Sequence, residues 1–157
     1  MQKLMGLVRR CVDDYHMIEA GDRIAVGVSG GKDSLTLLSV LAALRAYYPK
    51  PFALEALSID MGLGGMDFAP VEALCRELDV PFTIRHTEIG KIIFDYRKEK
   101  NPCSMCAKMR RGALNDLISE HGFNKVALGH HFDDAVETML MSLLYEGRIG
   151  CFEPVTY

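Results

Sequence analysis

The sequence has 157 residues and a formal net charge of −3, with 49% hydrophobic and 25% charged residues. This length suits one globular domain with its own core, and the composition excludes a disordered chain. No apolar run approaches the roughly 20 residues of a membrane span, and the N-terminus lacks the apolar stretch of a secretory signal. We therefore expect a cytoplasmic protein without membrane contact. Its five cysteines are an odd number and include one C-x-x-C pair, which favours metal or redox use over structural disulfides.

The chain opens with an amphipathic helical pattern from Gln2 to Ala20, which Gly21 ends. A short apolar run then predicts a first strand over Arg23 to Val28, and a helix follows from Asp33 to about Tyr48. Between strand and helix lies a glycine turn, Gly-Val-Ser-Gly-Gly-Lys-Asp-Ser, over residues 27–34. Such a turn aims free backbone N–H groups and the positive end of the helix dipole at one point, which suits a phosphate group.

Two common phosphate loops do not fit this turn. A Walker loop needs a glycine where this chain has Val26 and a Ser or Thr where it has Asp33. The dinucleotide fingerprint needs a glycine at the position of Ser29. The remaining pattern, S-G-G-K-D-S at 29–34, resembles the PP-loop of the ATP pyrophosphatase superfamily, whose members cleave ATP between the α and β phosphates to adenylate a substrate. An ordinary tight turn between a strand and a helix is the alternative.

The middle of the chain continues the alternation of strands and helices. We expect strands over Phe52 to Asp60 and Pro81 to Thr87, joined by a helix over about Phe68 to Leu78 in which Cys75 is a buried core residue. Asp60 ends its strand at the edge where open α/β sheets bind ligands, which makes it a candidate nucleotide or metal contact. A plain loop aspartate is equally consistent with the sequence.

A basic stretch follows, from Lys91 to Arg111, with seven basic residues against two acidic ones. Such a stripe can neutralise nucleic-acid phosphates, or it can be a solvated surface. We expect the segment from Ile89 to Lys100, which overlaps the start of this stretch, to be irregular. Asn101 and Pro102 then begin a helix, which places Cys103 in the first turn and Cys106 on the same face. Two adjacent thiolates can share a soft metal ion or a cluster.

A fourth strand, Lys125 to Gly129, leads into the polar segment His-His-Phe-Asp-Asp at 130–134 and a helix from Ala135 to about Tyr145. In a layered α/β fold this segment faces the glycine turn, where it can bind a divalent ion, position a nucleotide or transfer protons. A helix cap is the alternative role for its aspartates, Asp133 and Asp134.

The alternation predicts an α/β fold: a three-layer, doubly wound and mostly parallel sheet. We treat 1–157 as one domain, with an N-terminal helix over 1–21 and an α/β core over 22–157. Such sheets usually have five or more strands, and Val155-Thr156-Tyr157 looks like the start of one. We therefore expect this core to lack its last strand and helix.

Three motifs occur in order: S-G-G-K-D-S at 29–34, P-C-S-M-C-A-K-M-R-R-G at 102–112 and G-H-H-F-D-D-A-V-E-T at 129–138. Together they resemble the tRNA 2-thiocytidine synthetase family of PP-loop ATPases, over roughly residues 20–157. The resemblance implies an AMP-forming tRNA sulfurtransferase that adenylates the C2 oxygen of a cytidine and replaces it with sulfur.

The resemblance also implies ATP, Mg2+ and a [4Fe-4S] cluster held by three cysteines, with zinc as the alternative metal. Two of these match Cys103 and Cys106, and the third lies in a downstream segment that this sequence does not contain. Cys151 lies too close to the last helix to be a good match, and Cys11 is a distant substitute. The expected partners are tRNA, a sulfide or persulfide carrier as sulfur donor, and a second copy in a homodimer.

The resemblance assigns roles to individual residues. The catalytic candidates are Asp33, Asp134, Cys103 and Cys106, and the two cysteines are also the metal ligands. Lys108, Arg110 and Arg111 are expected to contact nucleic acid. The residues expected to bind ATP are Val28, Ser29, Gly30, Gly31, Lys32, Asp33, Ser34, Asp60, Gly129, His130 and Asp134.

Two other functions remain open. A PP-loop enzyme with another acceptor, similar to tRNA lysidine synthetase or an amide-forming ligase, would use the same ATP site, but such reactions need no soft metal at a C-x-x-C motif. A non-catalytic ATP- or metal-binding module would hold zinc at the cysteines with two further ligands.

Overall fold

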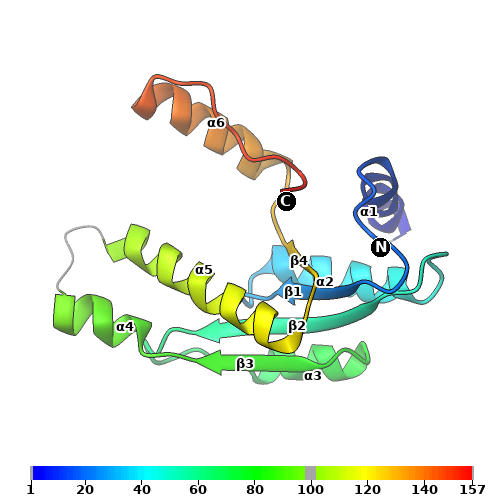
Figure 1. The fold of residues 1–157 in the computed structure, drawn as a ribbon, viewed down its shortest axis with the longest axis horizontal. Coiled ribbons are helices and arrows are strands. Elements are labelled where there is room, and N and C mark those ends of the chain that lie inside the picture. Colours follow the sequence, from blue (N-terminus) through cyan, green and yellow to red (C-terminus); the bar gives the residue numbers. More distant parts are fainter. Residues whose placement is uncertain (1, 98–101, 157) are drawn as a thin grey trace.

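A sheet of four parallel strands forms the centre of the described part of the chain (Figure 1). The computed structural model describes residues 2–97 and 102–156. Within them the sheet has the strand order β3-β2-β1-β4, which places the first strand inside the sheet and the last at one edge. The strands are β1 (Arg23–Gly27), β2 (Ala53–Asp60), β3 (Phe82–His86) and β4 (Lys125–Leu128).

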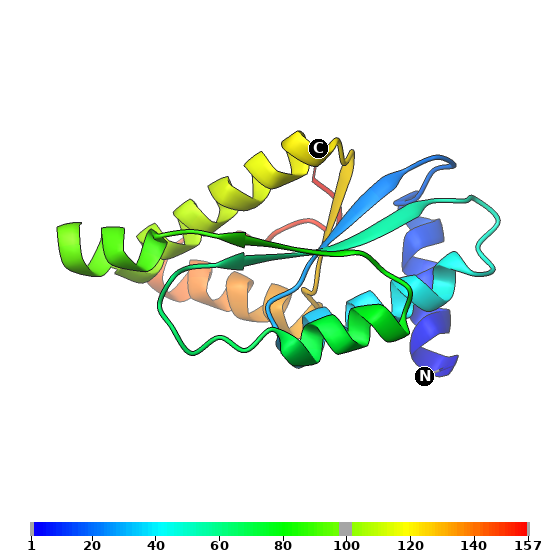
Figure 2. The same ribbon diagram turned by 90° about the horizontal axis from the view of Figure 1, so that it is seen from below.

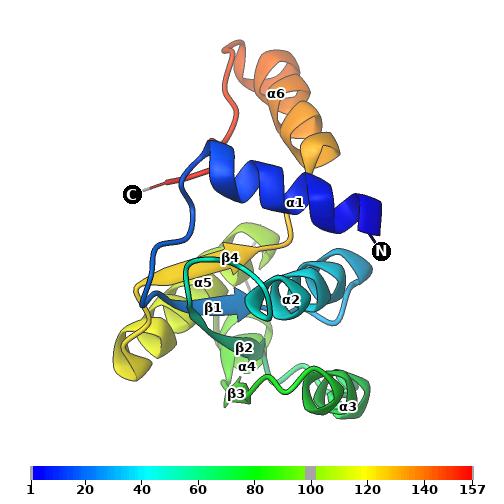
Figure 3. The ribbon, with the colours of Figure 1, turned by 90° about the vertical axis from the view of Figure 1, so that its right-hand side faces the viewer.

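Helices cover both faces of the sheet (Figures 2 and 3). One face carries α2 (Lys32–Arg45) and α3 (Ala69–Glu77), and the other carries α5 (Pro102–His121). The neighbouring residues Ala25 and Val26 point to opposite faces, and both are fully buried in separate core clusters. A strand covered on both faces has no side exposed to water, which is why β1 reads as an apolar run. The predicted α/β fold is confirmed.

The N-terminal helix α1 (Gln2–Asp14) packs on the α2 side of the sheet. Val12 lies in the same core cluster as Leu38, and the Tyr48 hydroxyl donates a hydrogen bond to Asp13 at 2.7 Å. The helix ends at Asp14 and not at Ala20 as predicted, because His16 adopts a left-handed backbone conformation with φ of 49°.

The segment expected to be irregular is helical, which corrects the prediction. The short helix α4 (Ile89–Lys91) continues into a π-helix, η1 (Ile92–Arg97). Ile89 and Ile93 are 4% and 0% exposed and pack with Leu117 of α5. Burial of these two isoleucines, one helical turn apart, orders the segment despite its charge. The predicted helix cap and part of the basic stretch lie outside the described residues, at Lys98, Glu99, Lys100 and Asn101.

The last helix, α6 (Phe132–Glu146), stands apart from these layers, beyond β4 (Figures 1 and 3). It begins before the predicted start at Ala135, because His131 already serves as its N-terminal cap. Residues 147–156 form no strand, so the strand predicted from Val155 is absent from the part of the chain described, and Tyr157 lies outside it. Within residues 2–97 and 102–156, no helix is both long enough and apolar enough to cross a bilayer.

A buried carboxylate ties β1 to β4 at the amino end of the sheet. Asp22 is 4% exposed and accepts hydrogen bonds from the Asn124 amide and the Glu19 backbone N–H, at 2.7 and 2.6 Å. The Lys125 ammonium lies 2.7 Å from the same carboxylate. Burial acts to raise the pKa of Asp22, but the bonds from Lys125, Glu19 and Asn124 outweigh it and hold the pKa below 3.8.

We predict that Asp22→Asn destabilises the fold by about 3 kcal/mol at neutral pH, because it removes the buried charge that pairs with the half-buried Lys125. The folded pKa lies below the ordinary value, so the carboxylate stabilises the fold at higher pH, and this contribution is lost as pH falls below 3.8. Urea unfolding from pH 7 to pH 3 measures both effects. Asp79→Asn, at an exposed aspartate, is the matched control and should change stability little. A variant as stable as the parent at pH 7 would contradict the prediction.

Candidate functional site

The glycine turn after β1 presents the N-terminus of α2 at the carboxyl end of the sheet. Gly30 adopts φ of 79°, which a glycine tolerates without strain, and Gly31 is the extended residue that caps the helix. The first helical backbone bond runs from the Leu35 N–H to the Gly31 carbonyl at 3.1 Å. The preceding N–H groups of the first turn therefore have no intrahelical acceptor and can bind an anion.

Two serines hold the turn in shape. The Ser34 hydroxyl, 6% exposed, donates to the Gly31 carbonyl at 3.0 Å and accepts from the Ser29 N–H at 3.2 Å. Val28 lies beneath the turn, where its N–H bonds to Leu57 and its carbonyl accepts from the Ser58 hydroxyl. Of the residues predicted to bind ATP, Val28 and Ser34 thus support the turn from below.

Lys32 and Asp33 lie at the open side of the turn. The Lys32 ammonium contacts both carboxylate oxygens of Asp33, at 2.8 and 3.0 Å, and this bond raises the pKa of Lys32. Lys32 remains largely exposed, with 83% of its side-chain surface free. The ammonium is therefore positioned at the mouth of the turn, where a phosphate group would compete with Asp33 for it.

The loop between β4 and α6 lies directly against the start of α2, as predicted. A Cβ atom at Gly129 would lie 2.8 Å from the Ser34 nitrogen and 3.0 Å from the Asp33 carbonyl carbon. Only a residue without a side chain permits this approach of two backbones. The contact places the polar segment 130–134 beside the glycine turn.

Within that segment one imidazole lies between two carboxylates. His131 Nε2 is 3.9 Å from an Asp33 oxygen, and His131 Nδ1 is 3.7 Å from an Asp134 oxygen. Asp134 also accepts the His131 backbone N–H at 2.8 Å, and this bond, with the nearby histidines, lowers the pKa of Asp134. His130 is 3.7 Å from Asp134, and its ring is tilted by 45° against that of Phe152, at 5.2 Å between ring centres. Asp134 therefore caps α6 and also faces the glycine turn.

Asp60 ends β2 at the same edge and pairs with a histidine that the sequence reasoning did not select. His86 Nδ1 donates to Asp60 at 2.9 Å, and Asp60 also accepts the Gly62 N–H at 2.9 Å. The Gly62 bond and then the His86 bond lower the pKa of Asp60. Asp60, Met61 and the loop after them line a cavity of about 210 Å³. The signal that identifies His86 is its place as the last residue of β3, at the same edge as Asp60.

The C-x-x-C motif lies at the start of α5, with Pro102 at the first helical position as predicted. Strands β2 and β3 point toward the end of the molecule where α5 begins (Figure 1). Cys103 is exposed, and Cys106 is half-buried against the core beneath α5. Two thiol groups on one helical face suit a soft metal.

The other cysteines do not complete this pair. Across residues 2–97 and 102–156, no three His, Cys, Asp or Glu side chains are grouped to hold a metal ion. Cys151 bonds to the Ala135 carbonyl on α6 at 3.2 Å, Cys11 lies on α1, and Cys75 is buried as predicted. Neither Cys11 nor Cys151 therefore serves as the third ligand in this arrangement. The predicted nucleic-acid contacts Lys108, Arg110 and Arg111 are exposed on α5, following the two cysteines.

Comparison with known proteins agrees with this arrangement. The family described as PP-loop domain matches residues 5–150. A protein of Geobacter metallireducens named tRNA-cytidine(32) 2-sulfurtransferase is 42% identical over 154 residues, which cover 98% of this chain and 60% of the relative. A protein of the same name from Coxiella burnetii is 39% identical over 158 residues, with the same two coverages. This chain thus spans about three fifths of the length of these relatives.

One solved structure is similar over almost the whole chain. It is the U34-tRNA thiolase NcsA from Methanococcus maripaludis with its [4Fe-4S] cluster, with a TM-score of 0.76 and 26% sequence identity. The match covers 94% of this chain and 52% of the thiolase.

We predict that Gly129→Ala weakens binding of a non-hydrolysable ATP analogue by 10-fold or more, because the added methyl group forces the β4–α6 loop away from the start of α2. Isothermal titration calorimetry measures the change. Gly6→Ala is the matched control, since a Cβ at Gly6 meets no atom within 4 Å. An unchanged affinity in Gly129→Ala would show that the close contact does not shape the site.

Proposed function

We propose that this chain, which belongs to the PP-loop domain family, carries out the ATP-dependent step of a tRNA sulfurtransferase. The main support for this proposal is the contact of Gly129 with the start of α2, because it brings Asp134 and His131 beside the glycine turn. An anion site and a pair of carboxylates, both at the carboxyl end of the sheet, suit the binding of a nucleoside triphosphate with its metal ion.

In the first step, the C2 oxygen of a cytidine attacks the α-phosphorus of ATP, an O–P bond forms, and pyrophosphate leaves. The free N–H groups of the α2 first turn and the Lys32 ammonium would stabilise charge on the departing pyrophosphate. In the second step, the sulfur of a hydrosulfide ion adds to C2, the C–O bond breaks to release AMP, and the S–H proton passes to solvent. Carbonyl oxygen is a poor leaving group, and adenylation makes it part of AMP.

Mg2+ fits this site because two carboxylates, from segments far apart in the sequence, lie on either side of His131. Asp33 and Asp134 are the residues that would hold it, directly or through water. The ion would offset negative charge along the triphosphate. It would also relieve the competition between Asp33 and a phosphate group for Lys32.

Cys103 and Cys106 fit two of the ligands of an iron–sulfur cluster, since both lie on one face at the start of α5. The described residues supply no third ligand beside them. The proposed reaction therefore has no step at a cluster. Iron–sulfur at this pair is favoured over zinc because the thiolase of similar structure carries a [4Fe-4S] cluster.

The proposed substrate is tRNA, with a cytidine at position 32 as the reacting base, after the names of the 42% and 39% identical relatives. Uridine 34 is the second candidate, since the structurally similar thiolase acts there. The exposed cations of α5 would contact RNA phosphates. The sulfur donor, a homodimer and a cytoplasmic location remain predictions.

The test is AMP formation by the anaerobically purified protein with tRNA, ATP, Mg2+ and sulfide. We expect tRNA-dependent AMP release, about 100-fold slower in Lys32→Met because the variant loses charge stabilisation at the leaving pyrophosphate. Lys50→Met removes an exposed lysine paired with Glu19 and is the matched control. Cys103→Ser/Cys106→Ser should keep ATP binding. ATP binding without AMP release would favour a non-catalytic module, and AMP release that tRNA does not stimulate would favour another acceptor.

We also predict that Arg110→Ala/Arg111→Ala weakens tRNA binding about 10-fold. The slope of log affinity against log salt concentration should fall by about two, the loss expected for two phosphate contacts. Fluorescence anisotropy with labelled tRNA, at salt concentrations from about 50 to about 200 mM, measures the affinity and its dependence on salt. Arg9→Ala/Arg10→Ala removes the same charge from α1, where both arginines pair with aspartates. Equal losses in the two double variants would mean that only net charge matters.

A further inference from the structure

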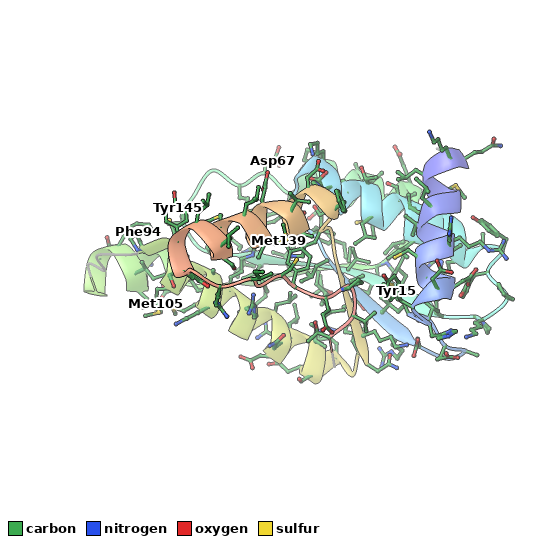
Figure 4. All side chains as sticks on the ribbon, turned by 90° about the horizontal axis from the view of Figure 1, so that it is seen from above. Tyr15, Asp67, Phe94, Met105, Met139 and Tyr145 are labelled. Carbon is green, nitrogen blue, oxygen red and sulfur yellow. The ribbon has the colours of Figure 1, made fainter. Side chains whose placement is uncertain are left out.

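The π-helix η1 holds an aromatic ring at the surface beside the start of α5. Ile93 is 0% exposed and packs with Ile89 in the core beneath α5, whereas the next residue, Phe94, is 48% exposed. Met105 of α5 packs against the same core cluster as Ile93. Phe94 and Met105, both labelled in Figure 4, lie at the same end of the molecule. A π-helix is rare and occurs frequently at functional sites, which directs attention to this ring.

The loop after β2 extends the apolar surface from Phe94 toward Asp60. The Gly90 N–H donates to the Met61 carbonyl at 2.7 Å, and a Cβ at Gly90 would lie 2.5 Å from a methyl carbon of Leu63. Leu63 therefore packs directly on α4, about one helical turn before Phe94. Leu63 is 53% exposed and lines the cavity beside Asp60. We call Leu63 and Phe94 together the apolar ledge.

Positive charge lies on the helix that packs beside this ledge. Lys108, Arg110 and Arg111 are exposed on α5, which contacts both α4 and η1. Asp95 is exposed next to Phe94, so the cations of α5 outnumber the negative charge beside the ring. Proteins that bind unpaired RNA combine cations, which contact the phosphates, with exposed aromatic rings on which the bases stack. The ledge and α5 together provide both components.

We propose that the apolar ledge binds an unpaired base of the tRNA substrate, with the ring of Phe94 stacked on the face of that base. This inference rests on the proposed function, because it assigns the ledge to the same substrate. The ledge joins the carboxyl end of β2 to the start of α5. A base bound there would be a neighbour of the reacting base. Phe94 is therefore a positioning residue, which holds the RNA loop while the chemistry takes place at the glycine turn.

A protein partner fits the ledge less well than a base does. A stable protein interface buries about 800 Å² on each partner. Two half-exposed apolar side chains offer much less area than this, and charged residues of α5 lie beside them. One planar base can cover the face of one phenyl ring, and its phosphates can reach the neighbouring cations.

The experiment measures the binding of two labelled RNAs by fluorescence anisotropy: the stem-loop of a tRNA anticodon arm, and a fully paired duplex of equal length. We expect Phe94→Ala to weaken binding of the stem-loop about 10-fold, because one stacked base is lost, and to leave duplex binding unchanged. Unchanged duplex binding also shows that the variant is folded. The slope of log affinity against log salt concentration should equal that of the parent, since no phosphate contact is removed.

Three further variants separate stacking from other effects. Phe94→Tyr keeps an aromatic ring and should bind the stem-loop as the parent does. Phe94→Leu keeps an apolar side chain without a ring and should bind it as weakly as Phe94→Ala. Tyr15→Ala is the matched control, because Tyr15 is 50% exposed and lies at the opposite end of the molecule in Figure 4. It should bind both RNAs as the parent does.

Stem-loop binding by Phe94→Ala equal to that of the parent would overturn the inference and leave the proposed function standing. Equal losses for the stem-loop and the duplex would overturn it too, since they would indicate a loss of general affinity for RNA and not of stacking. A parent chain that binds neither tRNA nor the stem-loop would contradict the proposed function itself, and with it this inference.

Discussion

The site depends on one close approach between two backbones. Gly129, at the end of β4, packs on the first residues of α2, leaving no space for a side chain. The contact joins segments about 100 residues apart and fixes the distance between the glycine turn and the polar segment 130–134. Displacing either backbone would separate Asp33 from His131 and Asp134.

The parallel sheet makes this approach possible. Every strand ends at the same edge, so the residues that follow β1, β2 and β4 converge there although they lie far apart in sequence. Helices on both faces fix the positions of the strands, and the buried Asp22 holds β1 and β4 together at their amino ends. The amino ends of the strands therefore hold a buried ion pair that stabilises the sheet, and the carboxyl ends lead into the polar residues of the candidate site.

Much of this arrangement could be predicted from sequence because its signals are local. An apolar run followed by a glycine turn specifies a strand, a turn and a helix start within about ten residues. The pairing of His86 with Asp60 could not be predicted in this way, since it depends on the order of β2 and β3 in the sheet. The helix at 89–97 was missed because two isoleucines order a segment whose other residues favour solvent. The boundary of α1 was missed because no proline or glycine marks Asp14.

The position of β1 has a consequence for the order in which the chain folds. β1 pairs with β2, a neighbour in sequence, and also with β4. Asn124, the residue before β4, accepts a hydrogen bond from the Arg23 N–H across 101 residues. Contacts at short separation close with little loss of chain entropy, whereas distant ones form late. During synthesis, β1, β2 and β3 can therefore assemble on α2 before β4 has emerged from the ribosome. The glycine turn would then exist well before the loop after β4 packs against it, so the two halves of the proposed site form at different times during synthesis.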